Sequence, residues 1–405
     1  MILGQIAWVD CIAFLVFLAP QLLIQVGLFE TAKCGIKALP FLLLRLPYQF
    51  LKTRYFTRHP SKPPFVQVAS PFQDIVIRCV RYAFACIPAS IGKVFFSKNV
   101  ALPFMRFRML RHGYLRSPIY WREVNRGDLN GLYAIADETR RPDIVVYYCH
   151  GGGFSMGSAF FYLEFLLAWV HLLKVEGGYD NPALFALDYT LVPEATYPTQ
   201  AQQTLTGYKY VLSLVDSSSN IVVSGDSAGA TLILSLLLCL SDYTPLRNRM
   251  PGLAVVISPW AAIISPKNQN TASDYLNAES LHLYGSQYIG TKADADDSLV
   301  SPGRCKDLSW WRRASPSAGW FFVYGSEEVF APETRDLIEL LKKAGGGSVG
   351  KNEGVNGEIG GVAVHEEQKW VHAWPVVKLF LCNTGEERMS GLRSIVRVTR
   401  ERIKV

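Results

Sequence analysis

The stretch I-V-V-S-G-D-S-A-G-A-T, residues 221–231, decides the fold of this 405-residue chain. It opens with an apolar, β-branched run and closes with the start of a helical pattern. Between them, G-D-S-A-G is a G-x-S-x-G pattern in the strand–turn–helix setting that it requires. We expect the turn to be so tight that Gly225 and Gly229 have no room for a Cβ atom. Ser227 is therefore predicted to be a strained nucleophile, with its hydroxyl aimed at a substrate.

Short β-rich runs alternate with helical stretches from about residue 130 onwards. The runs are residues 144–149, 184–188, 221–224, 253–258, 320–324 and 362–365. Helical patterns between them include residues 160–175, 228–240 and 331–344. Continuous apolar strands that alternate with helices predict an α/β fold, with a mostly parallel sheet covered on both faces.

A second glycine-rich stretch, C-H-G-G-G-F-S at residues 149–155, ends an earlier strand. A serine that attacks a carbonyl needs a base and hydrogen-bond donors for the developing oxyanion. Gly152 and Gly153 can offer bare backbone N–H groups, and the N–H of Ala228 would complete an oxyanion hole. The alternatives are a flexible turn or a phosphate-binding loop, but this stretch contains neither G-x-G-x-x-G nor G-K-[ST].

Together, H-G-G-G-F, D-Y-T-L-V-P-E (residues 188–194) and G-D-S-A-G resemble the hormone-sensitive-lipase-like branch of the α/β-hydrolases. The resemblance extends from about residue 146 to residue 372 and includes S-P-W at residues 258–260. It implies an α/β-hydrolase fold with a helical cap. It also implies supporting roles for residues within and between the motifs: His150, Gly151, Asp226, Asp188 and Glu194.

The resemblance further implies the order serine, acid, histidine along the chain. The acid follows the strand W-F-F-V-Y-G, where Glu328 fits the family register and Glu327 is the alternative, although the family more often has Asp. The base is His372, in an H-A-W setting that is similar to the family's H-x-F/W. The alternative, His365, is interpreted as an ordinary core or surface histidine.

These residues predict a serine hydrolase that cleaves a lipophilic ester by two-step acyl transfer, without a metal or organic cofactor. Two other functions remain open. The chain could be a small-molecule receptor on the same fold, although the presence of His372 argues against this, or an acyltransferase that uses the same triad.

The N-terminus predicts attachment to a membrane. Residues 11–29 are uncharged, and these 19 residues are long enough to cross a hydrocarbon core of about 30 Å. Basic residues follow, which places the catalytic part on the cytosolic side of an endoplasmic-reticulum type of membrane if the segment spans. We expect a membrane segment at residues 1–59 and a catalytic domain at residues 60–405, with cap elements at about 60–125 and 265–312. The segment could also lie on the membrane, or be an amphipathic helix of the cap.

Composition excludes several other classes of protein. The formal charge of +7 comes without a basic block that has interleaved aromatic residues, so nucleic acid is not an expected partner. The eight cysteines contain no C-x-x-C pair, which argues against a zinc site and a dense disulfide framework. The glycine-rich residues 345–361 predict a surface loop.

Overall fold

The computed structural model describes residues 3–345 and 361–404, which form one mixed sheet with the strand order β1-β2-β4-β3-β5-β6-β7-β8. Strands β3 to β8 are parallel, whereas β2 is antiparallel to both β1 and β4. The strands are Tyr120–Arg126 (β1), Leu129–Ile135 (β2), Val145–Cys149 (β3), Ala183–Leu187 (β4), Ile221–Asp226 (β5), Leu253–Ile257 (β6), Trp320–Gly325 (β7) and Val362–Glu367 (β8). The predicted mostly parallel α/β sheet is confirmed. The loop predicted at residues 345–361 lies almost wholly outside the described residues.

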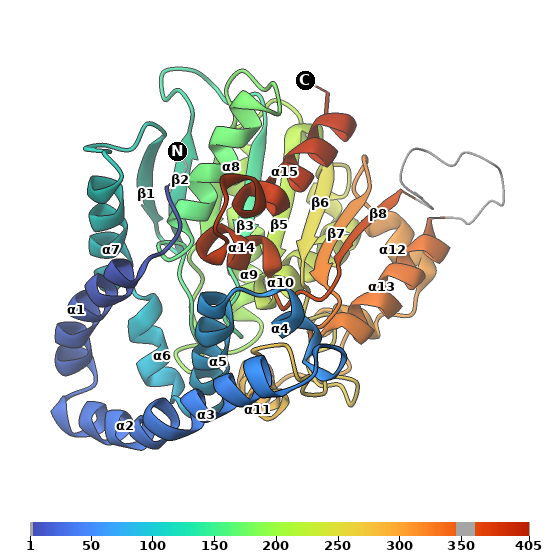
Figure 1. Cartoon of the computed structure of the whole chain (residues 1–405). Helices are drawn as coiled ribbons and strands as arrows, with labels where there is room; N and C mark the ends of the chain where they lie inside the picture. Colours follow the sequence, from blue (N-terminus) through green and yellow to red (C-terminus); the bar gives the residue numbers. More distant parts are fainter. Residues whose placement is uncertain (1–2, 346–360, 405) are drawn as a thin grey trace.

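Helices cover both faces of the sheet (Figure 1). One layer contains α8 (Leu163–Val175), α14 (Trp374–Leu381) and α15 (Gly385–Arg402), which pack against one another. The other layer contains α9 (Thr199–Leu212), α10 (Ala228–Asp242), α12 (Leu308–Ala314) and α13 (Ala331–Ala344). Nearly all side chains of α10 are buried, as expected for a helix that is apolar on every side and lies against the central strands.

The parallel strands bring the sequence motifs to one edge of the sheet. In the register, Cys149 pairs with Gly225, and Asp226 pairs with Ile257. The residues that follow β3, β5, β6, β7 and β8 therefore emerge side by side, although they are far apart in the sequence. In open α/β sheets, ligands bind outside the carboxyl ends of the strands, so a ligand site is expected at this edge.

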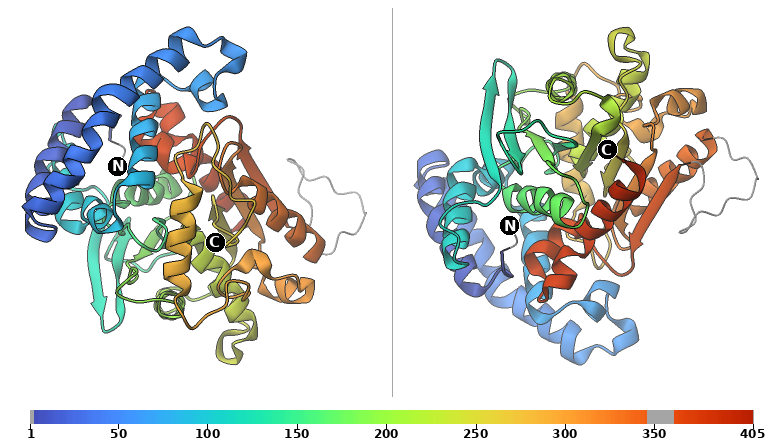
Figure 2. Two further views of the ribbon diagram at one scale, coloured as in Figure 1. Left: turned by 90° about the horizontal axis from the view of Figure 1, so that it is seen from below. Right: turned by 90° about the horizontal axis from the view of Figure 1, so that it is seen from above.

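A helical layer covers that edge. It contains α1 (Trp8–Gln25), α2 (Leu28–Pro40), η1 (Phe41–Arg45), α3 (Leu46–Leu51), η2 (Lys52–Phe56), η3 (His59–Ser61), α4 (Pro64–Val68), α5 (Pro71–Cys86), α6 (Ala89–Phe96), α7 (Lys98–Arg111) and α11 (Ala278–Ile289). Three short 3-10 turns, η4 (Ser218–Asn220), η5 (Thr244–Leu246) and η6 (Pro302–Arg304), lie elsewhere in the chain. Seen from below, α1 to α3 run as an arc along the rim (Figure 2). The expected first cap element, residues 60–125, thus contains α4 to α7 but reaches into β1.

Candidate active site

Ser227 occupies a strained turn between β5 and α10. Its backbone angles, φ 54° and ψ −121°, lie outside the regions that L-residues ordinarily populate. A Cβ atom on Gly225 would lie 2.5 Å from the carbonyl carbon of Gly229, and one on Gly229 would lie 2.0 Å from the oxygen of Cys149. Only glycine therefore fits at these two positions, and the crowded turn holds the serine at the end of its strand.

The carboxylate of Asp226 fixes the glycine loop beside this turn. Its Oδ1 accepts the backbone N–H of Gly151 at 2.8 Å and the hydroxyl of Tyr148 at 2.6 Å, and its Oδ2 accepts the hydroxyl of Tyr162 at 2.8 Å. Gly152 and Gly153 follow with φ values of 113° and 62°. In the described part of the chain, the N–H groups of these two glycines donate to no protein acceptor, so they are available to a ligand.

His150 holds the glycine loop through contacts with Gly151 and Tyr189. Its Nδ1 lies 2.8 Å from the oxygen of Gly151, and its ring stacks on Tyr189 with 4.4 Å between the ring centroids. The hydroxyl of Tyr189 donates to the backbone oxygen of His150 at 2.8 Å. Asp188 accepts the N–H of Ala159 at 3.1 Å. These contacts attach the D-Y-T-L-V-P-E stretch to the neighbouring loops.

His372 and Glu328 form a buried pair. Nδ1 of His372 lies 3.3 Å from Oε2 of Glu328, and each side chain is at most 3% exposed. The other carboxylate oxygen, Oε1, accepts the hydroxyl of Ser258 at 2.6 Å and the N–H of Gly325 at 2.5 Å. Ser258 also accepts the N–H of Ala373 at 2.9 Å, so it joins the loop of the acid to the loop of the histidine.

The two alternative residues lie in different surroundings. The carboxylate of Glu327 is half-buried and accepts the hydroxyl of Ser326 at 3.3 Å. His365 lies on β8, where its ring nitrogens contact Ser394 at 3.0 Å and Glu367 at 2.8 Å. Glu328 and His372 are the pair that meets at the edge of the sheet.

Burial controls the protonation of this pair. Burial raises the pKa of the Glu328 carboxyl, and the hydrogen bonds from Ser258 and Gly325, which favour the carboxylate, oppose that shift. Burial likewise lowers the pKa of His372, against the carboxylates of Asp274 and Asp226, which raise it. At neutral pH the imidazole is therefore uncharged and able to accept a proton.

Asp274 is a site residue that sequence reasoning missed. It is fully buried, and its Oδ1 accepts the backbone N–H of His372 at 3.0 Å. It lies in the polar segment that we interpreted only as a cap. Ser258 was likewise noted as part of S-P-W, without a role.

Ser227, His372 and the glycine loop line one cavity of about 270 Å³. Its remaining wall is mainly apolar and comes largely from α5, α11 and α14, with Phe96 of α6 and Ile6 beside them. Examples are Val80 and Phe84 of α5, Leu281 of α11, and Val377 and Phe380 of α14. A mostly apolar pocket with a few convergent polar groups is the usual form of a small-molecule site.

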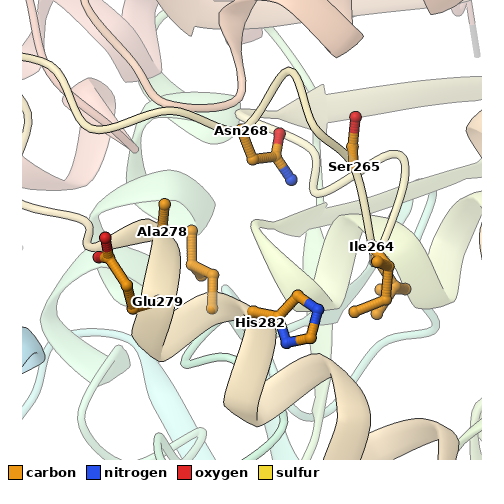
Figure 3. A pocket seen from close by; sticks show the side chains of 8 residues that line it. Ile264, Ser265, Asn268, Ala278, Glu279 and His282 are labelled. Atoms are coloured by element: carbon orange, nitrogen blue, oxygen red, sulfur yellow. The ribbon is translucent and has the colours of Figure 1, made fainter.

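A second hollow, of about 390 Å³, lies beside α11 (Figure 3). It is lined by residues such as Ser265, Asn268, Glu279 and His282, and by Leu281, which also lines the first cavity. Leu281 therefore borders both spaces. Throughout residues 3–345 and 361–404, the structure contains no group of three or more His, Cys, Asp or Glu side chains that could hold a metal ion.

The fold and the strand–turn–helix serine define an α/β-hydrolase. An esterase from the bacterial hormone-sensitive lipase family has a similar fold, with a TM-score of 0.63 and 22% identity over 83% of this chain and 100% of that structure. The chain belongs to the steryl acetyl hydrolase family, whose model matches residues 123–374. The resemblance to the hormone-sensitive-lipase-like branch is confirmed.

Curated relatives carry related names. A putative steryl acetyl hydrolase of Schizosaccharomyces pombe is 29% identical over 50% of this chain and 56% of its own length. An acetyl-hydrolase of Streptomyces hygroscopicus is 30% identical over 51% and 64%. Steryl acetyl hydrolase 1 of Saccharomyces cerevisiae is 24% identical over 65% and 60%. The matches thus span about three fifths of the length of these relatives.

Proposed function

We propose that this chain is a serine hydrolase that cleaves carboxylic esters of lipophilic alcohols. The observation that carries the proposal is the convergence on one apolar cavity of Ser227, His372 and two glycine N–H groups that have no acceptor among the described residues. Membership of the steryl acetyl hydrolase family supports the same reaction. The catalytic roles follow from the position of each group.

In the first step, His372 takes the proton of the Ser227 hydroxyl, and Oγ attacks the ester carbonyl. Because Nδ1 of His372 faces Glu328, Nε2 is the nitrogen left to accept that proton. Glu328 fixes the orientation of the ring and stabilises the imidazolium. The N–H groups of Gly152, Gly153 and Ala228 donate to the carbonyl oxygen as it becomes an anion, each typically lowering the barrier by about 3 kcal/mol.

The imidazolium then gives its proton to the leaving alcohol, and the acyl group remains on Ser227. In the second step, the neutral imidazole removes a proton from water, which attacks the acyl-enzyme. Collapse of the second tetrahedral intermediate releases the acid and restores the Ser227 hydroxyl. Proton and acyl group are thus accounted for by the residues of the site and by water.

The lining of the cavity supports a lipophilic substrate. Apolar side chains of α5 and α14 face the space beside the serine, which favours a hydrophobic alcohol over a charged one. The names of the relatives, steryl acetyl hydrolase and acetyl-hydrolase, favour a short acyl group. We therefore propose acetyl esters of sterols or of comparably hydrophobic alcohols as the substrate class.

A panel of esters tests this function. Wild type, Ser227→Ala and His372→Ala are compared on esters with short and long acyl chains and with polar and hydrophobic alcohols. We expect the wild type to prefer acetyl esters of hydrophobic alcohols, and both variants to be inactive. Undiminished hydrolysis by Ser227→Ala would disprove the mechanism, and a preference for polar alcohols would disprove the substrate class.

We also propose that the N-terminal helices attach the enzyme to a lipid bilayer. Helix α1 is long and apolar enough to cross a membrane, judged by length and composition alone. Most of the large apolar side chains that are exposed in the structure lie between Trp8 and Phe56, and Lys33, Lys37 and Arg45 lie exposed among them. Exposed apolar side chains interspersed with cations are typical of helices that bind anionic lipid surfaces.

The contacts of α1 favour an orientation along the membrane surface. Asp10 is fully buried and forms ion pairs with Arg108 at 3.3 Å and Arg111 at 2.7 Å, both on α7. Leu18 packs against Val94 and Val100. A helix that crossed the bilayer would have to break these contacts, so we expect α1 to stay on the domain and present only its outer face to lipid.

Extraction of membranes at alkaline pH separates the two orientations. We expect the full chain to be released with peripheral proteins. Retention in the membrane pellet, together with loss of accessibility at one end of α1, would show that the helix spans.

A further inference from the structure

Both backbone polar groups of His372 are bonded to two consecutive residues of the cap segment. The N–H of His372 donates to Oδ1 of Asp274 at 3.0 Å. The carbonyl oxygen of His372 accepts the hydroxyl of Tyr275 at 3.1 Å. The ring of Tyr275 also contacts the ring of His372 edge-on, with 5.8 Å between the centroids. The residue proposed as the base is therefore held by a segment about 100 positions earlier in the chain.

The carboxylate of Asp274 also reaches the loop of the proposed acid. Its Oδ2 accepts the N–H of Val329, the residue after Glu328, at 2.9 Å. Its Oδ1 additionally accepts the N–H of Tyr275 at 2.8 Å. One buried carboxylate thus receives backbone donors from the base loop and the acid loop, which fixes the distance between them.

Two further contacts hold Asp274 itself in place. The hydroxyl of Thr271 accepts the N–H of Asp274 at 2.9 Å and donates to the carbonyl oxygen of Glu327 at 2.8 Å. Arg81 of α5 donates to the carbonyl oxygens of Asp274 at 2.7 Å and Ala272 at 2.9 Å. The cap segment is therefore attached on one side to the acid loop and on the other to a cavity-lining helix.

We propose that Asp274 and Tyr275 are positioning residues for His372, so that the cap is required for the chemical step and not only for binding substrate. This inference rests on the proposed function, because it gives His372 the role of the base. A shift of His372 by a fraction of an ångström would weaken both its contact with Glu328 and its approach to Ser227. Such a shift slows the reaction without changing the apolar walls that bind the substrate.

The charge of Asp274 gives a second, independent readout. The titratable groups that act on His372 are Glu328, against Nδ1, and the carboxylates of Asp226 and Asp274, while Arg81 faces Asp274 from α5. The Asp274 carboxylate raises the pKa of His372 against the effect of burial. Replacing it by a neutral amide therefore lowers the pKa of His372, whereas replacing a carboxylate that does not act on His372 would leave that pKa unchanged.

The test compares Asp274→Asn and Tyr275→Phe with the matched exposed controls Asp128→Asn and Tyr120→Phe. Hydrolysis of p-nitrophenyl acetate gives kcat, KM and the pH dependence of kcat/KM, and thermal unfolding checks the fold. For Asp274→Asn we expect a fall in kcat of about 10- to 100-fold, since small misplacements of catalytic groups have effects of that size. KM should stay within about twofold. The acid limb of the kcat/KM profile should move to lower pH, because the pKa of His372 falls. Tyr275→Phe should lower kcat by a smaller factor, without moving the limb.

The outcomes separate the two proposals. If Ser227→Ala is inactive but both cap variants keep the wild-type kcat and pH profile, the positioning role is wrong and the proposed function stands. If Ser227→Ala is active, the proposed function itself fails. Should Asp274→Asn not fold, Tyr275→Phe, which removes a single hydroxyl, decides by whether kcat falls while KM stays within about twofold, because Tyr275 also lines the cavity.

Discussion

The carboxyl edge of the sheet buries polar side chains, whereas the N-terminal helices α1 to α3 expose apolar ones. At the edge, polar residues such as Asp226, Asp274 and Glu328 are buried, and each accepts a hydrogen bond from a neighbouring loop. On the helices, apolar residues such as Ile24 and Leu43 are exposed, at 76% and 68%. The edge is completed by contacts within the chain, because buried polar groups need partners. The exposed apolar side chains of α1 to α3, which we call the helical face, have no such contacts within the described chain, and an exposed apolar surface of this kind indicates a partner outside the chain.

The largest expected effect concerns the acid at the edge. Glu328→Gln keeps the size of the side chain but removes the charge that supports the imidazolium and the acceptor that selects its tautomer. We expect kcat/KM to fall by about 10³- to 10⁴-fold. Glu327→Gln is the matched control and should stay within about twofold, because its carboxylate bonds only to Ser326 among the described side chains. Equal losses for the two variants would contradict the assignment of Glu328.

A smaller effect is expected in the glycine loop. Gly153→Ala places a Cβ atom 3.1 Å from the ring of Tyr284, at a φ of 62°, and should displace the N–H that faces the oxyanion. We expect kcat to fall by about 10²-fold. Gly113→Ala controls for backbone strain, because its φ is 82° and, apart from its chain neighbours, no atom of the described residues lies within 4 Å of its Cβ position. A similar loss in Gly113→Ala would show that strain, and not the oxyanion hole, explains the result.

Substitutions on the helical face should weaken membrane binding and leave ester hydrolysis unchanged. Ile24→Glu with Leu43→Glu should reduce flotation with vesicles of phosphatidylcholine and phosphatidylserine by about tenfold, since charge is costly at the lipid interface. The kcat for a soluble ester should stay within about twofold. Leu115→Glu, which changes an 88% exposed leucine outside these helices, is the control. A loss of soluble-ester activity in the double variant would show that the two regions are not independent.

The smallest expected effect is a displacement of the acid limb of the wild-type pH profile, relative to the limb that an ordinary histidine would give. Because burial lowers the pKa of His372, its neutral form persists below the usual value of 6.5. The half-maximal value on the acid limb of the wild-type kcat/KM profile should therefore lie below pH 6.5. A half-maximal value above pH 6.5 would mean that the base is a solvated histidine.

The same contrast explains what the sequence could predict. Ser227, the glycine loop and the strands β3 to β8 are encoded by contiguous stretches, in which the motif and the apolar run stand next to each other. Strand β1 was missed because most of its side chains are exposed or half-buried, so it leaves no apolar run. Residues at the edge that bond to distant parts of the chain are not marked by any pattern in their own stretch of sequence either.

Asp274 and Ser258 illustrate this limit. They bond to the backbone of residues 98 and 115 positions later in the chain. Asp274 stands in a polar segment and is locally indistinguishable from a solvated loop residue. Its burial follows only from the way the cap folds onto the two loops that follow β7 and β8.

Ser227 is proposed as the nucleophile and His372 as its base. Labelling of the folded wild-type protein with a fluorophosphonate, followed by mass spectrometry of the adduct, tests this most directly. The account predicts a single adduct on Ser227, absent in Ser227→Ala and formed far more slowly in His372→Ala. An adduct on another residue, or hydrolysis of esters by a protein that the probe does not label, would contradict it.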